Sequence, residues 1–68
     1  MKASEAKKLI GQEVWIKRNY DWRAIPCVIL EVAGRNVRVD RLGSEDWYWL
    51  PDCRIYLEKP NYNPEHLG

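Results

Sequence analysis

Hydrophobic and polar residues alternate with a period of two in "EVWIKR" and "NVRVDR", so that each segment has one apolar face. This is the period of a β-strand, in which successive side chains point to opposite faces. The run "AIPCVILEV" is rich in β-branched residues, and "WYWL" and "IYLE" are two shorter runs of strand-forming residues. The five predicted strands are 13–18, 24–32, 36–41, 47–50 and 55–58.

The N-terminal segment lacks this alternation and predicts a short helix over 3–10. Ser4 is the expected N-cap, Lys7 and Lys8 lie near the C-terminal end, and Gly11 ends the helix. Between the strands, "RNYDW" and "LGSED" are predicted loops, "AGRN" is a tight connection, and "PDCR" is a turn of 3₁₀ character.

Five short strands joined by turns predict an all-β fold, a small and strongly bent barrel. The chain divides into a short N-terminal helix at 1–10, a barrel at 11–58 and a flexible C-terminal tail at 59–68. The predicted core contains Val14, Ile16, Cys27, Ile29, Val37, Val39 and Leu50.

The composition fits a folded domain with little charge bias. Of the 68 residues, 46% are hydrophobic and 31% are charged, which is the range of globular proteins and not of disordered ones. The net charge of +1 does not by itself indicate a nucleic-acid partner. No apolar run is long enough for a signal peptide or a membrane span, so we expect a cytoplasmic protein with no membrane partner.

Candidate catalytic and metal-binding residues are few. The two cysteines, Cys27 and Cys53, are expected to be reduced thiols, and together with His66 they would still lack a fourth zinc ligand and any CxxC spacing. No Ser or Cys stands next to a plausible base, and there is no glycine-rich phosphate loop. The sequence therefore predicts a protein that is not an enzyme and has no cofactor.

Four segments, "IGQEVWIK", "IPCVILEV", "NVRV" and "WLPDCRI", resemble in order and spacing the SH3-like barrels of the Tudor and KOW type. The chain is most similar to the Tudor-like C-terminal domain of the bacterial RNA chaperone ProQ, and its first strand is similar to that of retroviral integrase C-terminal domains. The resemblance covers Ile10 to about Leu57 and implies a five-stranded SH3-like barrel with a short helix. It also implies that Cys27, at the position of a small buried Ala, is structural.

One part of the Tudor pattern is missing. A cage for methyl-lysine or methyl-arginine needs aromatic rings on several sides of the cation. The matching positions here are Arg18, Ile25 and either Val39 or Asp40, none of which is aromatic. The sequence therefore disfavours a reader of methyl marks.

The remaining aromatic residues are candidates for display. The pattern of the fourth strand predicts either Trp49 or Leu50 in the core, Tyr48 at a rim and Trp47 outside. The resemblance implies that Tyr20, Trp22 and Trp47 gather on one side of the barrel. Aromatic rings among cations are typical of surfaces that bind single-stranded nucleic acid. The candidate ligand-binding residues are Tyr20, Trp22, Trp47, Tyr48, Arg18 and Arg23.

Two functional hypotheses follow from this surface. In the first, the protein is a non-catalytic module of nucleic-acid machinery that contacts RNA or single-stranded DNA. In the second, the same patch docks a protein or peptide, and the C-terminal tail orders on binding. An accessory protein of a phage or mobile element fits either hypothesis. A third and simpler interpretation is that nearby carboxylates neutralise the cations on an ordinary mixed surface.

Overall fold

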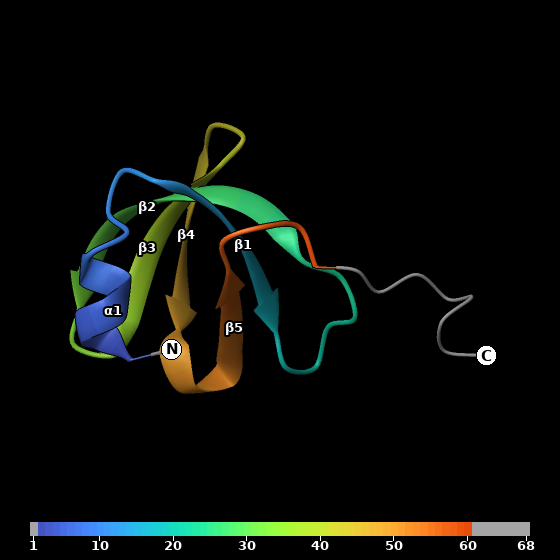
Figure 1. Ribbon diagram of the computed structural model, residues 1–68, viewed down its shortest axis with the longest axis horizontal. Coiled ribbons are helices and arrows are strands. Elements are labelled where there is room, and N and C mark those ends of the chain that lie inside the picture. The colour runs from blue at the N-terminus through green and yellow to red at the C-terminus, as the bar shows by residue number, and fades with distance from the viewer. Residues whose placement is uncertain (1, 61–68) are drawn as a thin grey trace.

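The computed structural model describes residues 2–60, and in it five strands form one antiparallel sheet beside a short helix (Figure 1). The elements in chain order are α1 (Ala3–Lys7), β1 (Glu13–Arg18), β2 (Ile25–Ala33), β3 (Asn36–Arg41), β4 (Ser44–Trp49), the 3₁₀ turn η1 (Leu50–Asp52) and β5 (Cys53–Tyr56). The strand order is β4-β3-β2-β1-β5. Within the described residues the sheet has two edges, β4 and β5, and the expected closed barrel is not confirmed.

β2 pairs with β1 along its first half and with β3 along its second half, and the register of the pairing with β3 is interrupted once. Its first half pairs with β1, from Ile25 to Val28, and the stretch from Val28 to Ala33 pairs with β3. The register shifts between Ile29 and Glu31, which marks a β-bulge. Bulges bend a strand and increase its twist, so β2 curves and brings its two partner strands round one core.

The core lies on the concave side of the sheet and is closed at one end by α1. The alternation read from the sequence is confirmed, because the even-numbered apolar positions of β1 and the odd-numbered ones of β3 are buried. Ala6 of α1 belongs to the same cluster. All seven predicted core residues are buried, and four further ones are Ala6, Ala24, Tyr48 and Cys53.

The segment "LGSED" is not a loop, and that prediction is wrong. Only Leu42 and Gly43 connect β3 to β4, and both have positive φ, as the central residues of a type I′ hairpin turn do. The Asp40 carboxylate accepts a hydrogen bond from the backbone N–H of Gly43 at 2.8 Å. Such turns usually have the sequence Asn-Gly or Asp-Gly. Here only the glycine is present, and leucine, which is rare at positive φ, gave no indication of a turn.

Three other boundaries differ from prediction. The helix begins at Ala3 with Lys2 as its N-cap and ends at Lys7, so Ser4 is not the cap. The 3₁₀ turn begins at Leu50, one residue earlier than expected, and β5 spans Cys53–Tyr56. Of the predicted tail, residues 61–68, with His66, lie outside the described residues. No helix among the described residues is long and apolar enough to cross a membrane.

The register predicts the cost of a charge in the core. Val39 is fully buried and stands opposite Asp46 of β4. Val39→Asp would therefore place two carboxylates across from each other, and the new carboxylate, at position 39, would have no access to solvent. We expect this variant to lose cooperative thermal unfolding, because an unpaired buried charge costs several kcal/mol in a small domain. Asn36→Asp, at the exposed start of the same strand, is the control and should melt like the parent. A cooperative, parent-like melt of Val39→Asp would contradict the assignment of β3.

Candidate functional site

The three adjacent aromatic residues of β4 divide between the two faces of the sheet. Tyr48 is 2% exposed and pairs with buried Val37, whereas Trp47 and Trp49 are 48% and 54% exposed. Trp47 thus lies outside the core as predicted, and of Trp49 and Leu50 it is Leu50 that is buried. The placement of Tyr48 at a rim is wrong, because its side chain follows the inward parity of β4.

Arg18 joins two strands that are not neighbours in the sheet. Its guanidinium carbon lies 4.1 Å from the centre of the Tyr48 ring, and one of its nitrogens lies 3.8 Å from the Asp46 carboxylate. From the other side, Arg41 donates a hydrogen bond to the Tyr48 hydroxyl at 3.4 Å. Arg18 and Tyr48, both candidate ligand-binding residues, therefore hold each other, and they leave little free surface for a ligand.

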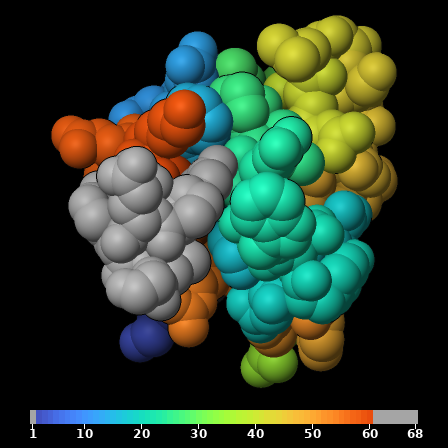
Figure 2. Space-filling view, turned by 90° about the vertical axis from the view of Figure 1, so that its right-hand side faces the viewer, coloured from blue at the N-terminus to red at the C-terminus, as the bar shows by residue number. Residues whose placement is uncertain are grey.

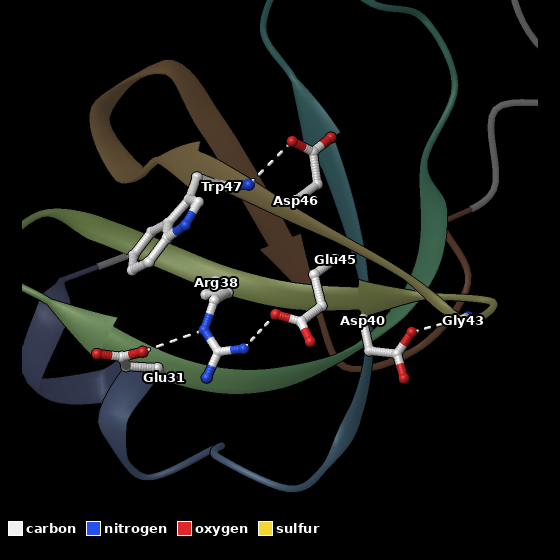
Figure 3. A network of polar contacts seen from close by, with 7 residues as sticks. All are labelled: Glu31, Arg38, Asp40, Gly43, Glu45, Asp46 and Trp47. Atoms are coloured by element: carbon white, nitrogen blue, oxygen red, sulfur yellow. Dashed lines mark hydrogen bonds and ion pairs between the residues drawn. The ribbon is translucent and has the colours of Figure 1, made fainter.

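A second polar cluster neutralises the outer face of β2, β3 and β4 (Figure 3). Arg38 donates hydrogen bonds to Glu31, at 3.1 Å, and to Glu45 on the other side. These two bonds raise the pKa of Arg38. Trp47 stands opposite Arg38 on β4 and projects on the same side of the sheet (Figure 3). The cation beside Trp47 is therefore already matched by two carboxylates.

The β1–β2 loop carries the most exposed aromatic rings. Tyr20 and Trp22 are 72% and 70% exposed, and the Arg23 guanidinium lies 5.4 Å from the centre of the Trp22 ring. The loop forms a protruding ridge (residues 19–24, teal in Figure 2). It is tied at its start, where the backbone N–H of Asn19 donates to the carbonyl of Asp52 at 2.8 Å. Trp22 and Arg23 thus form one exposed pair, while Trp47 lies with Arg38 on the outer face of the sheet.

A hollow of about 590 Å³ lies where the N-terminal segment, the β1–β2 loop, the β2–β3 turn, η1 and β5 meet. Leu50, Pro51 and Cys53 supply its apolar lining. Backbone contacts hold its walls together, because the N–H of Leu50 donates to the carbonyl of Arg35 at 2.7 Å and Asn19 is bonded to η1.

The charged residues that line this hollow are all positive, and we refer to it as the basic hollow. Its polar lining consists of Lys2, Arg35, Arg54 and Asn19, and no carboxylate is among the lining residues. Within residues 2–60 none of the three cations takes part in an ion pair. Arg54 also stands directly opposite Lys17 of β1, and like charges in that position repel each other. A bound anion would relieve this repulsion.

Two exposed aromatic residues are neighbours in sequence of residues that line the basic hollow. Trp49 directly precedes Leu50, and Tyr20 directly follows Asn19, where both Leu50 and Asn19 line the hollow. Sequence reasoning missed the hollow because its three cations are far apart along the chain and follow no motif. Only the predicted turns "AGRN" and "PDCR" marked places where these segments meet.

The described residues contain no cluster of metal-ligating side chains. Among residues 2–60, no three His, Cys, Asp or Glu side chains gather closely enough to hold a metal ion. Both cysteines are buried free thiols, as expected, and the Cys53 thiol lies 3.7 Å from the carbonyl oxygen of Leu50. Burial raises the pKa of the Cys27 thiol to about 11 and raises that of Cys53 as well.

Comparison of the chain with protein-family models, curated proteins and solved structures finds no match. The resemblance to Tudor-like domains therefore stays a prediction.

The position of Arg18 predicts its contribution to stability. Arg18→Gln removes both the contact with the Tyr48 ring and the ion pair with Asp46. We expect a loss of about 1–2 kcal/mol in the free energy of unfolding, the sum of a partly buried cation–π contact and a weak surface ion pair. Urea denaturation measures it, with Arg23→Gln on the exposed loop as the control, for which less than about 0.5 kcal/mol is expected. Equal effects of the two variants would show that Arg18 does not join β1 to β4.

The buried thiols predict slow modification. At pH 8, a rise in the pKa of Cys27 from 9.0 to about 11 leaves about 100-fold less thiolate than an ordinary cysteine has, and burial restricts access further. Both cysteines should therefore react with Ellman's reagent much more slowly in the native protein than in urea, where two thiols per chain should titrate. Rapid reaction of the native protein would contradict the placement of Cys27 and Cys53 in the core.

Proposed function

We propose that the protein is a non-catalytic module that binds single-stranded nucleic acid, RNA or DNA, at the basic hollow. The observation that carries this proposal is the gathering of Lys2, Arg35 and Arg54 in one hollow without a carboxylate, in a chain whose net charge is only +1. A hollow of this composition suits a phosphate group, because each cation supplies charge and N–H donors to its oxygens.

The flanking rings favour a single strand over a duplex. Bases of a single strand are free to stack on aromatic side chains, whereas those of a duplex already stack on each other. Trp49 and Tyr20 are next in sequence to Leu50 and Asn19 of the lining, and in this proposal a strand whose phosphate sits in the hollow stacks a base on each ring. The exposed pair of Trp22 and Arg23 extends this surface along the loop.

In this proposal the six residues predicted from the sequence divide by role. Tyr20, Trp22 and Arg23 contact the strand directly, whereas Trp47, which stands opposite the ion-paired Arg38, belongs to the second candidate function described below. Arg18 and Tyr48 act by positioning, since their contact fixes the base of the loop against β4.

We further propose that the sheet is an SH3-like barrel of the Tudor type. The strand order β4-β3-β2-β1-β5 and the 3₁₀ turn between β4 and β5 support this assignment. So does the contact of Arg18 with Asp46 and Tyr48, which spans the interior between strands that the sheet order separates. The basic hollow then lies at the end of the barrel where the β1–β2 loop meets the 3₁₀ turn.

A protein partner on the same surface is the second candidate. The observation that favours it is that Arg38, which stands opposite Trp47, is ion-paired with both Glu31 and Glu45. The exposed Trp47 ring is therefore paired with a cation that is already neutralised. β4 is also an edge strand, whose outer backbone groups can pair with an added strand.

Fluorescence titration with short oligomers of thymidine and uridine tests the nucleic-acid proposal. We expect quenching of tryptophan emission at low salt, with log Kd rising with log salt at a slope of about 2, because three cations would contact phosphates of a single strand. Arg54→Gln should lower that slope by about 0.7, whereas Lys8→Gln, an exposed cation of the N-terminal segment, should leave it unchanged. Trp49→Ala should weaken binding about 5- to 150-fold, as loss of a stacking ring does.

The absence of quenching at low salt would overturn the nucleic-acid proposal. So would equal effects of Arg54→Gln and Lys8→Gln, because nonspecific attraction would then suffice. Circular dichroism of each variant shows whether it is folded, and duplex DNA of the same length should bind more weakly than the single strand.

A further inference from the structure

A second hollow lies on the outer side of the sheet, away from the basic hollow. Its volume is about 480 Å³, and it lies between the β1–β2 pair and the tip of the β3–β4 hairpin. Trp15, Pro26, Val28 and Leu42 line it with apolar surface, and Glu13 and Asp40 line it with carboxylates. We refer to these six residues as the hairpin groove.

The strand register explains why the hairpin groove exists. β3 pairs with β2 only as far as Val28, opposite Asp40, whereas β2 continues for three more residues toward Ile25. Pro26, in this stretch that pairs with β1 but not with β3, has no N–H to donate to a further strand. The hairpin therefore leaves β2 here, and its tip stands clear of the sheet (Figure 1, olive).

Leu42 at the tip is an anomaly by two independent measures. It is 92% exposed, and it is the one non-glycine residue with positive φ among the described residues, at 52°. Asparagine or glycine would suit this turn better, and either would remove an apolar side chain from water. Residues held in an unfavourable conformation cluster at binding sites. With 92% of its surface exposed, Leu42 buries little apolar area within residues 2–60, and its side chain is accessible to another molecule.

The charges of the hairpin groove define the partner. Glu13, Val28 and Asp40 lie in register across β1, β2 and β3, so that one apolar side chain stands between two carboxylates. No cation is among the lining residues. The chain itself places a cation nearby, since the Lys59 ammonium lies 5.7 Å from the centre of the Trp15 ring.

We propose that the hairpin groove is a docking site for a basic peptide segment of a partner protein, one that carries an aliphatic side chain flanked by arginine or lysine. The aliphatic side chain lies against Leu42, Trp15 and Pro26. The flanking cations face Glu13 and Asp40. This site is separate from the basic hollow and holds whether or not that hollow binds nucleic acid.

Two short peptides test the proposal by nuclear magnetic resonance of the ¹⁵N-labelled full chain. The probe is acetyl-Gly-Arg-Leu-Arg-Gly-amide, and its charge-reversed match has Glu in place of both Arg. We expect saturable shifts of the amide signals of Val28 and Gly43 and of the Trp15 indole N–H with the basic peptide. The acidic peptide should give none at equal concentration, because like charges repel.

Leu42→Asn separates docking from folding. Asparagine accepts positive φ, so the variant should melt at or above the temperature of the parent, yet it should bind the basic peptide about 10-fold more weakly because the apolar wall is lost. Leu57→Asn, at an exposed leucine outside the hairpin groove, should leave the affinity unchanged. Equal shifts with both peptides, no saturable shift with the basic one, or unaltered affinity of Leu42→Asn would each overturn the proposal.

Discussion

The contact of Arg18 with Tyr48 and Asp46 is the interaction on which the rest of the structure depends. β1 and β4 are separated in the sheet by β2 and β3, and this contact joins them across the interior. It lies on the inward face of β4, which pairing with buried Val37 and Val39 defines, and Trp47 and Trp49 lie on the opposite face. It also fixes the end of β1, from which the β1–β2 loop leaves to form one wall of the basic hollow.

The positive charges are distributed unevenly over the molecule, which the net charge of +1 does not reveal. On the outer face of β2, β3 and β4, Arg38 is held between Glu31 and Glu45, and its charge is matched locally. At the end of the molecule formed by η1 and the β2–β3 turn, Lys2, Arg35 and Arg54 gather without a carboxylate in the lining. A net charge near zero is therefore compatible with a strongly basic site, because ion pairs occupy other parts of the surface.

Local patterns in the sequence predicted the elements and the core, because a period of two directly reports which side chains point inward. Val14, Ile16, Val37 and Val39 are all buried as that period requires. The burial of Tyr48 was missed because "DWYWL" is apolar on both faces, so alternation alone does not indicate which face is inside. The extent of β4 was missed because Leu42, unlike asparagine or glycine, gives no signal of a tight turn.

The basic hollow was not predictable from local patterns at all. Its residues come from the N-terminal segment, two connections and β5, and only the fold brings them together. The grouping of Tyr20, Trp22 and Trp47 on one surface came from the resemblance and not from local patterns, and it stays a prediction. The structure shows a contact between Trp22 and Arg23 on the loop and sets Trp47 opposite Arg38.

The central claim is that the basic hollow and the exposed rings of Trp49 and Tyr20 form one surface for a single strand, and a direct map of that surface tests it. Titrating an eight-nucleotide thymidine oligomer into the ¹⁵N-labelled chain should shift the amide signals of Arg35, Leu50 and Arg54 together with the Trp49 indole N–H. The signals of Glu31 and Glu45, on the neutralised outer face, should stay in place. Shifts confined to that face, or none at the basic hollow while the rest of the spectrum changes, would contradict the account.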